Sequence, residues 1–246
     1  MPSVTQETTL MCISNQIGMG LMSNAVWKGV PLKALLEPAR AAANGKKVLL
    51  HGVDNYTDTF PLEKAMKPTT LVVYEMNGEP LPDRHGAPAR VLVPGYFGEK
   101  NVKWVTRIEV AEEDAKGFYE QQGWGPDFIV PIRSRFDDPD DKMQIELAKV
   151  SNGLPLKGVA FGGDRGISRV EVSLDDGKNW QEAKIDYPGT ELTWALWSYD
   201  WKPEAAGEYQ LTVRATDRQG RVQALDEKRP KTSGVTGLHK IMVRVA

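Results

Sequence analysis

The sequence has almost no cysteine: Cys12 is the only one among 246 residues. A single thiol excludes an intramolecular disulfide and any zinc site built from several thiolates. It leaves three chemical roles open, as a nucleophile, a redox group or one metal ligand. A lone cysteine taken by itself is more often a small buried apolar residue. The count alone therefore leaves Cys12 undecided between the core and a site.

A charge excess of one sign and long apolar runs are absent as well. Lys and Arg number 31 and Asp and Glu 33, a net charge of −2, which argues against a broad surface for nucleic acid or anionic membranes. No run of about 18 apolar residues occurs, so we expect no membrane segment in this chain. Residues 1–10 lack the basic and apolar regions of a signal peptide. We expect a periplasmic or other extracytoplasmic location if an export segment lies upstream, and a cytoplasmic one otherwise.

The first half, residues 1–124, mixes helix and strand signals and predicts an α+β domain. Asn77-Gly78 is a strong signal for a two-residue turn, because both residues tolerate positive φ. Pro31 favours a helix start and Gly45 a helix stop. The expected helices are 31–45, 61–66 and 112–122, and the expected strands are 48–50, 70–76, 90–93 and 103–110.

Residues 125–141 read as a linker. They contain three prolines and the acidic run Asp137-Asp138-Pro139-Asp140-Asp141, a composition typical of a surface crossing. The run lacks the spacing and the glycine of an EF-hand, so we expect a solvated loop there and no calcium site.

The second half, residues 142–246, has an all-β pattern. Val170, Val172 and Leu174 alternate with polar residues, which indicates a strand with one buried face. The residues 175–177, Asp-Asp-Gly, predict a hairpin turn. About seven short strands favour an immunoglobulin-like β-sandwich without its usual disulfide. We expect much of its core to come from four tryptophans: Trp180, Trp194, Trp197 and Trp201. The expected strands are 144–150, 156–161, 167–174, 181–184, 193–200, 209–216 and 239–245.

A series of short motifs runs through the chain from about Leu10 to the C-terminus. In the first half they are MCISN (11–15), WKGVPL (27–32), GVD (52–54), YTDTFPL (56–62), YEMNGEPLP (74–82), HGAPAR (85–90), VPG (93–95) and VKW (102–104). In the second half they are GGDR (162–165), RVEVS (169–173), DDGKNW (175–180) and RATD (214–217). Each is weak alone, but in this order they resemble the sulfite oxidase family of molybdopterin-dependent oxidoreductases. The resemblance covers part of the family's cofactor domain and its dimerisation domain.

The resemblance implies a molybdenum–molybdopterin cofactor (Moco) and assigns roles to seven residues. Cys12 stands where the family has the thiolate that binds the metal, a role that suits a soft ligand. Tyr56 matches the family's active-site tyrosine, and Arg165 matches the arginine that reaches the substrate anion. The positions that match cofactor-binding residues are Asp54, His85, Arg90 and Lys103. An arginine and a lysine suit the phosphate of the pterin, while Asp and His can bind its ring nitrogens.

The same resemblance implies an enzyme that transfers an oxygen atom to or from a small oxyanion or a sulfoxide-like substrate, with sulfite oxidation favoured. It also implies a homodimer and a separate electron-transfer protein, since the chain has no C-x-x-C-H haem motif. His51 and His239 match nothing catalytic, and we interpret them as structural.

The chain departs from the family in two places. The family's cofactor domain normally has about a hundred more residues before the cysteine, so we expect a fragment, a misassigned start or an incomplete pocket. Gln16-Ile17-Gly18-Met19-Gly20 stands where sulfite enzymes often have a basic residue, and Asn101 where a histidine is common. The alternative interpretation is a truncated, cofactor-free interaction or binding protein that retains the β-sandwich.

Overall fold

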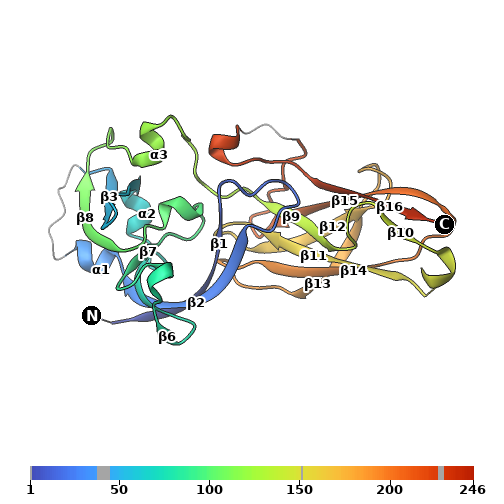
Figure 1. Ribbon diagram of the computed structural model, residues 1–246, viewed down its shortest axis with the longest axis horizontal. Helices are drawn as coiled ribbons and strands as arrows, with labels where there is room; N and C mark the ends of the chain where they lie inside the picture. Colours follow the sequence, from blue (N-terminus) through green and yellow to red (C-terminus); the bar gives the residue numbers. More distant parts are fainter. Residues whose placement is uncertain (1, 38–44, 151, 227–229) are drawn as a thin grey trace. The chain divides into compact units, whose positions relative to one another are not determined.

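The computed structural model describes residues 2–37, 45–150, 152–226 and 230–246, and these fall into two compact units. Unit 1 comprises residues 1–13, 22–130 and 231–233. Unit 2 comprises residues 14–21, 131–230 and 234–246. Figure 1 colours the elements of both units along the sequence. None of the described helices is long and apolar enough to cross a membrane.

Unit 1 is built mainly of two antiparallel sheets. The larger has the order β1-β2-β5-β6, with β7 also paired to β5, and the smaller has the order β4-β3-β8. The strands of the larger sheet are β1 Val4–Met11, β2 Met22–Pro31, β5 Leu71–Met76, β6 Glu79–Pro80 and β7 Arg90–Leu92. Those of the smaller are β3 Lys47–Gly52, β4 Thr57–Pro61 and β8 Val105–Ala111.

Helices contribute little to unit 1, which corrects the predicted balance of helix and strand. The described helices are α1 Lys33–Leu36, α2 Leu62–Ala65 and α3 Phe118–Gln121, with 3₁₀ turns η1 Asp83–His85 and η2 Gly98–Lys100. The long helix predicted over 112–122 is wrong except for α3. Gly117 directly precedes α3 and Gly123 lies just beyond its end, and glycine disfavours helix. The helix predicted over 31–45 is seen at residues 33–36, and residues 38–44 lie outside the described part.

The predicted turn at Asn77-Gly78 is confirmed, and it joins β5 to β6. Asn77 has φ of 54° and Gly78 of 84°, the left-handed conformations that this turn requires. Strands β1 and β2 pair over eight residues each, from Val4 with Gly29 to Met11 with Met22. This hairpin was not predicted, and it carries Cys12 at its end.

Unit 2 contains a continuous eight-stranded arrangement in the order β10-β16-β15-β12-β13-β14-β11-β9. Its strands are β9 Arg133–Asp138, β10 Met143–Ile145, β11 Leu154–Phe161, β12 Ile167–Ser173, β13 Gln181–Tyr187, β14 Ala195–Trp201, β15 Gly207–Asp217 and β16 His239–Val245. The first part of β13 pairs with β12 and its second part with β14. One hydrophobic cluster takes residues from strands on both sides of β13, so the sheet folds over a shared core.

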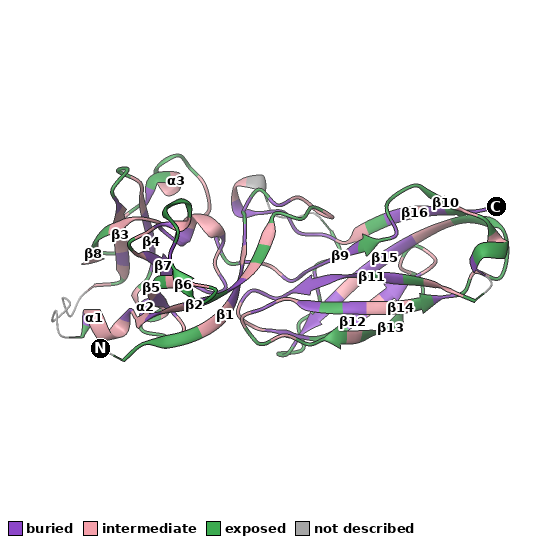
Figure 2. Cartoon of the chain, turned by 60° about the horizontal axis from the view of Figure 1, so that its bottom comes forward, coloured by how far each residue is buried: buried purple, intermediate pink, exposed green. Residues whose placement is uncertain are grey.

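The core of unit 2 confirms half of the tryptophan prediction. Trp197 and Trp201 are fully buried, whereas Trp180 and Trp194 are only partly buried. Figure 2 shows buried and exposed residues alternating along several strands, as the sequence pattern predicts for a sheet with one buried face. The immunoglobulin-like topology itself stays a prediction.

Two segments of unit 2 differ from the expected elements. Residues 147–150 form the 3₁₀ turn η3 and not the end of a strand. The expected linker, residues 125–141, contains strand β9, which pairs with β11 from Arg133 opposite Phe161 to Asp138 opposite Lys157. The acidic run therefore begins inside a strand, and the boundary between the units lies at residues 130–131.

Candidate active site

Cys12 lies directly after the last residue of β1, and its side chain is exposed. Its neighbours Met11 and Ile13 are buried, at 1% and 7% exposure. The thiol is thus held at the surface between two anchored side chains. A Cβ added to Gly98 would lie 3.5 Å from the Met11 carbonyl oxygen, so the strand end that carries Cys12 lies beside η2.

Arg90 is the most deeply buried of the predicted cofactor-binding residues. Its Nη1 donates to the His85 carbonyl at 3.1 Å and its Nη2 to the Asn101 carbonyl at 3.0 Å. The guanidinium lies 5.2 Å from the centre of the Trp27 ring. Among the described residues its Nε has no hydrogen-bond partner. Burial lowers the pKa of Arg90 to about 10, so it remains a cation with one donor unused.

Lys103 and His85 lie beside Arg90 and form with it a basic cluster. The Lys103 ammonium donates to the Arg84 carbonyl at 3.2 Å and lies 4.2 Å from the centre of the Trp104 ring. The pKa of His85 is lowered by partial burial and then by the charges of Arg84, Arg90 and Lys103. The structure therefore brings three of the predicted residues, and Arg84 with them, into one region of positive charge.

Asp54 lies in the turn between β3 and β4, next to the same cluster. Its Oδ1 accepts the backbone N–H of Tyr56 at 3.1 Å. A Cβ on Gly52 would lie 2.6 Å from that oxygen and 3.1 Å from the Lys103 carbonyl oxygen. The backbone N–H of Val53 donates to the Trp104 carbonyl at 3.0 Å. The turn that carries Asp54 therefore packs directly against the segment that carries Lys103.

Tyr56 is half-buried, and its hydroxyl is bonded inside unit 1. Its single proton is shared between two acceptors, Asp58 Oδ2 at 2.8 Å and the Glu99 carbonyl at 3.2 Å. Burial and then the negative charge of Asp58 raise the pKa of Tyr56, so the hydroxyl keeps its proton. Because Glu99 belongs to η2, Tyr56 contacts the same 3₁₀ turn that Met11 approaches. An oxyanion bound by Tyr56 would have to compete with these two bonds.

The Asp58 carboxylate beneath Tyr56 belongs to a buried ionic network that the sequence motifs did not indicate. Lys100 Nζ lies 2.6 Å from Asp58 Oδ1 and 3.4 Å from Glu120 Oε2, and its side chain is 2% exposed. The ammonium also lies 3.7 Å from the centre of the Phe128 ring. Lys100 and Glu120 line a cavity of about 590 Å³. The network thus links Tyr56 to this cavity of unit 1.

Glu99 is the other residue that the motifs missed. Its Oε1 is buried and has no hydrogen-bond partner in the part of the chain that the structure describes. Burial raises the pKa of Glu99 to about 8, and the nearby charge of Asp58 acts in the same direction. A polar residue at position 99 carries no local sequence signal of burial, since burial here arises from segments that are far apart in the chain.

Arg165 lies in unit 2, in the turn before β12. Its Nε lies 3.2 Å from Asp217 Oδ2, and its side chain is 12% exposed. Asp217 is fully buried and also accepts hydrogen bonds from the backbone and the guanidinium of Arg221. Arg165 is therefore a firmly anchored cation, and its predicted contact with a substrate anion stays a prediction.

Comparison with known proteins places this arrangement in a family. The family model for the oxidoreductase molybdopterin binding domain matches residues 1–119, and the model for the Mo-co oxidoreductase dimerisation domain matches residues 128–244. The chain belongs to the sulfite oxidase family of molybdopterin-dependent oxidoreductases. Six of the seven predicted site residues lie in the first matched region and Arg165 lies in the second.

Individual relatives agree with this assignment. The chain is similar to human mitochondrial sulfite oxidase, at 35% identity over 226 residues, which is 79% of this chain and 41% of the human protein. It is 30% identical over 291 residues to sulfite oxidase of Arabidopsis thaliana, with 98% of this chain and 73% of the plant protein covered. Among solved structures, the sulfane dehydrogenase SoxCD of Paracoccus pantotrophus matches with a TM-score of 0.82 and 27% identity, covering 99% of this chain and 70% of that one. The chain thus spans about two fifths of the length of the human relative.

The residues of unit 1 fit a molybdopterin cofactor, which the description of the matched domain names. Cys12 offers one exposed thiol, and a thiolate is a soft ligand suited to a molybdenum centre. The buried Nε of Arg90, which has no partner in the described part of the chain, and the ammonium of Lys103 suit a phosphate group. The Gly52 turn leaves no room for a side chain between Asp54 and Lys103. The donor set is therefore one thiolate plus a basic cluster.

Proposed function

We propose that this chain is the molybdenum-cofactor-binding part of an enzyme that transfers an oxygen atom to a small sulfur oxyanion, with sulfite as the favoured substrate. The observation that carries the proposal is the basic cluster of His85, Arg90 and Lys103, in which one buried guanidinium nitrogen has no partner among the residues that the structure describes. A buried donor without an acceptor costs roughly 1–3 kcal/mol. An anionic cofactor phosphate that fills this position would remove that cost.

In this proposal the chain's own residues hold the cofactor and orient the substrate. Cys12 binds the metal through its thiolate, Arg90 and Lys103 bind the phosphate of the pterin, and Asp54 and His85 bind its ring. When bound, the cofactor supplies a metal that takes up two electrons and exchanges oxygen with water. Tyr56 and Arg165 are the proposed partners of the substrate oxyanion.

Arg165 has the character expected of an anion-binding residue. Its anchoring by Asp217 fixes the guanidinium in place, and a cation that is already positioned stabilises an oxyanion without reorganisation. Two carboxylates lie near the guanidinium: Asp217, which it shares with Arg221, and Asp164, whose Oδ1 is 3.8 Å from Nη1. A homodimer and a separate electron acceptor complete the proposed enzyme, and the match of residues 128–244 to a dimerisation domain supports the former.

The experiment is a steady-state assay on the complete gene product, made in a host that synthesises the cofactor. Sulfite-dependent reduction of an artificial electron acceptor is expected for the unaltered chain. Arg165→Gln is expected to raise KM for sulfite by about tenfold or more, because a charged hydrogen bond is lost. The exposed Arg244→Gln is the matched control. A molybdenum-loaded protein without activity on sulfite, on other sulfur oxyanions or on sulfoxides would refute the proposed reaction.

A further inference from the structure

The segment that follows Cys12 is held by basic side chains of unit 2. We call residues 14–21 the cysteine loop; it contains no charged residue. Asn15 is buried at 3% exposure, and its Oδ1 accepts the backbone N–H of Leu21 at 2.9 Å, which closes the loop. A second bond runs from the Met19 N–H to the Gln16 carbonyl at 3.1 Å. These bonds define its shape but do not anchor it.

Arg133, the first residue of β9, provides the main anchor. Its Nη2 donates to the Asn15 carbonyl at 3.3 Å and to the Gln16 carbonyl at 2.8 Å, and its Nη1 donates to the Val235 carbonyl at 2.8 Å. Arg133 is 7% exposed. Buried hydrogen bonds from a charged donor are stronger than those between neutral groups. A neutral side chain at this position would leave two loop carbonyls without their donor.

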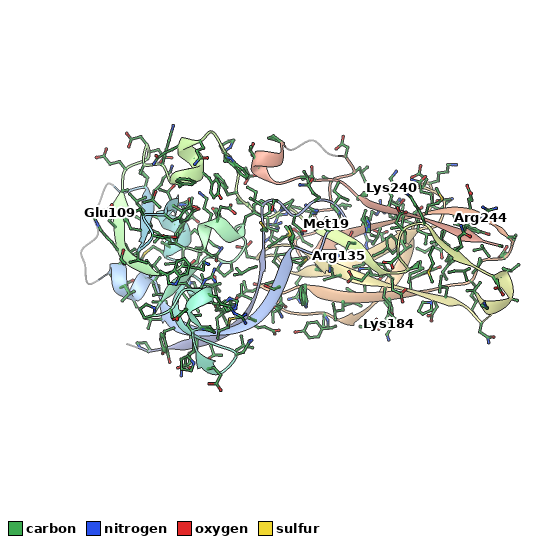
Figure 3. All side chains as sticks on the ribbon, in the orientation of Figure 1. Met19, Glu109, Arg135, Lys184, Lys240 and Arg244 are labelled. Carbon is green, nitrogen blue, oxygen red and sulfur yellow. The ribbon has the colours of Figure 1, made fainter. Side chains whose placement is uncertain are left out.

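Two further side chains contact the loop beyond Arg133. Arg135, also on β9, donates from Nη1 to the Met19 carbonyl at 3.0 Å, and its Nε pairs with Asp137 at 2.6 Å. Figure 3 shows the labelled Met19 and Arg135 next to each other. His239 of β16 packs against Gly18, where an added Cβ would lie 2.5 Å from the imidazole Nε2. Gly18 also has φ of +76°, a conformation that favours glycine.

We propose that Arg133, assisted by Arg135, is a positioning residue for Cys12. The chain is fixed on one side of Cys12 by the last residue of β1 and on the other by the bonds from Arg133, which begin at residue 15. The thiol between these two anchors is exposed, so it is presented in a restricted geometry. A metal ligand needs its supporting residues to fix its geometry. This inference rests on the proposed role of Cys12 as a metal ligand.

The test uses Arg133→Gln in the full chain, with Arg135→Gln as a second variant that removes only one contact to the loop. Arg244→Gln, an exposed arginine on β16, is the control for loss of charge. Hydrogen–deuterium exchange of the cofactor-free protein reports the loop directly. Peptides that cover residues 14–21 are expected to exchange about tenfold faster in Arg133→Gln. Arg135→Gln should show a smaller change, and Arg244→Gln none.

The second readout is retention of the metal. After purification from a cofactor-producing host, Arg133→Gln is expected to lose molybdenum during dialysis roughly 10- to 100-fold faster than the unaltered chain. Arg133→Lys, which keeps the charge but not the forked donor, should restore part of the retention. Normal exchange in the loop together with normal retention in both β9 variants would overturn the inference. Failure of the proposed function would look different, because the unaltered chain would then lack molybdenum as well.

Discussion

Glu99 provides the most quantitative prediction for unit 1. Its carboxyl lies near Asp58, its Oε1 is buried without a partner among the described residues, and burial raises its pKa to about 8. Replacement by glutamine keeps the shape of the side chain and removes the titration. The change therefore isolates the cost of placing a negative charge at this position.

The sign and size of the effect follow from the direction of the shift. The folded protein keeps the Glu99 proton up to about pH 8, whereas the unfolded chain releases it near its ordinary pKa of 4.5. The contribution of neutral Glu99 to stability is therefore complete below about pH 4.5 and is lost as the pH rises through 8. Each pKa unit corresponds to about 1.4 kcal/mol, so the full loss is roughly 3–5 kcal/mol. Glu99→Gln should escape it.

The assay is chemical denaturation of the cofactor-free protein between pH 5 and pH 9. The free energy of unfolding of Glu99→Gln, relative to the unaltered chain, is expected to increase steadily across this range and to level off above pH 8. Glu112→Gln, an exposed glutamate of the same unit, should show no such trend. If the difference between Glu99→Gln and the unaltered chain were the same at pH 5 and pH 9, the assigned burial of a neutral carboxyl would be refuted.

Two further predictions concern buried charges. Lys100→Met leaves Asp58 buried without its cation, so the free energy of unfolding at pH 7 should fall by roughly 3–5 kcal/mol. The Lys100→Met/Asp58→Asn double variant should recover part of this loss. An unchanged denaturation midpoint would contradict the burial of this pair. In unit 2, burial acts to raise the pKa of Asp217, but hydrogen bonds from Arg221 outweigh it and the pKa is lowered. The stabilisation from Asp217 is therefore present above about pH 4 and lost below it. Asp217→Asn should flatten the acid limb of a thermal-stability profile. An acid limb like that of the unaltered chain would show that ionised Asp217 does not stabilise the fold.

Local sequence signals predicted the parts of the fold that depend on local chemistry. The turn at Asn77-Gly78 requires two left-handed residues, and few other dipeptides supply them. The turn at Asp176-Gly177 follows the same rule and joins β12 to β13. The alternation of Val170 and Val172 with polar residues correctly predicted β12, because a strand with one buried face repeats every two residues.

Elements that depend on distant partners were missed. Strand β1 contains three threonines, one glutamine and one glutamate, and it becomes a strand by pairing with β2 and burying Thr8 and Thr9. Strand β9 lies among prolines and acidic residues, and its identity comes from pairing with β11. For the same reason the sequence did not predict the ion pair of Lys100 with Asp58, since these residues are 42 positions apart.

The candidate site was predicted from motifs and not from periodicity. The structure gathers Asp54, His85, Arg90 and Lys103 in one region of unit 1, which the order of the motifs alone could not establish. It also reveals that Arg133 holds the loop after Cys12. An arginine that opens a strand has no sequence feature that distinguishes it from a solvent-exposed one.

The most direct measurement of cofactor binding by this chain is molybdenum per chain, determined by elemental mass spectrometry on protein from a host that makes the cofactor. We expect a ratio near one for the unaltered chain. Cys12→Ala keeps the residues that bind the pterin, so the metal it retains should show one sulfur ligand fewer in its X-ray absorption spectrum, with the circular dichroism spectrum unchanged because the thiol is exposed. The same number of sulfur ligands in both proteins would show that Cys12 is not a ligand. No molybdenum in either would contradict cofactor binding by this chain.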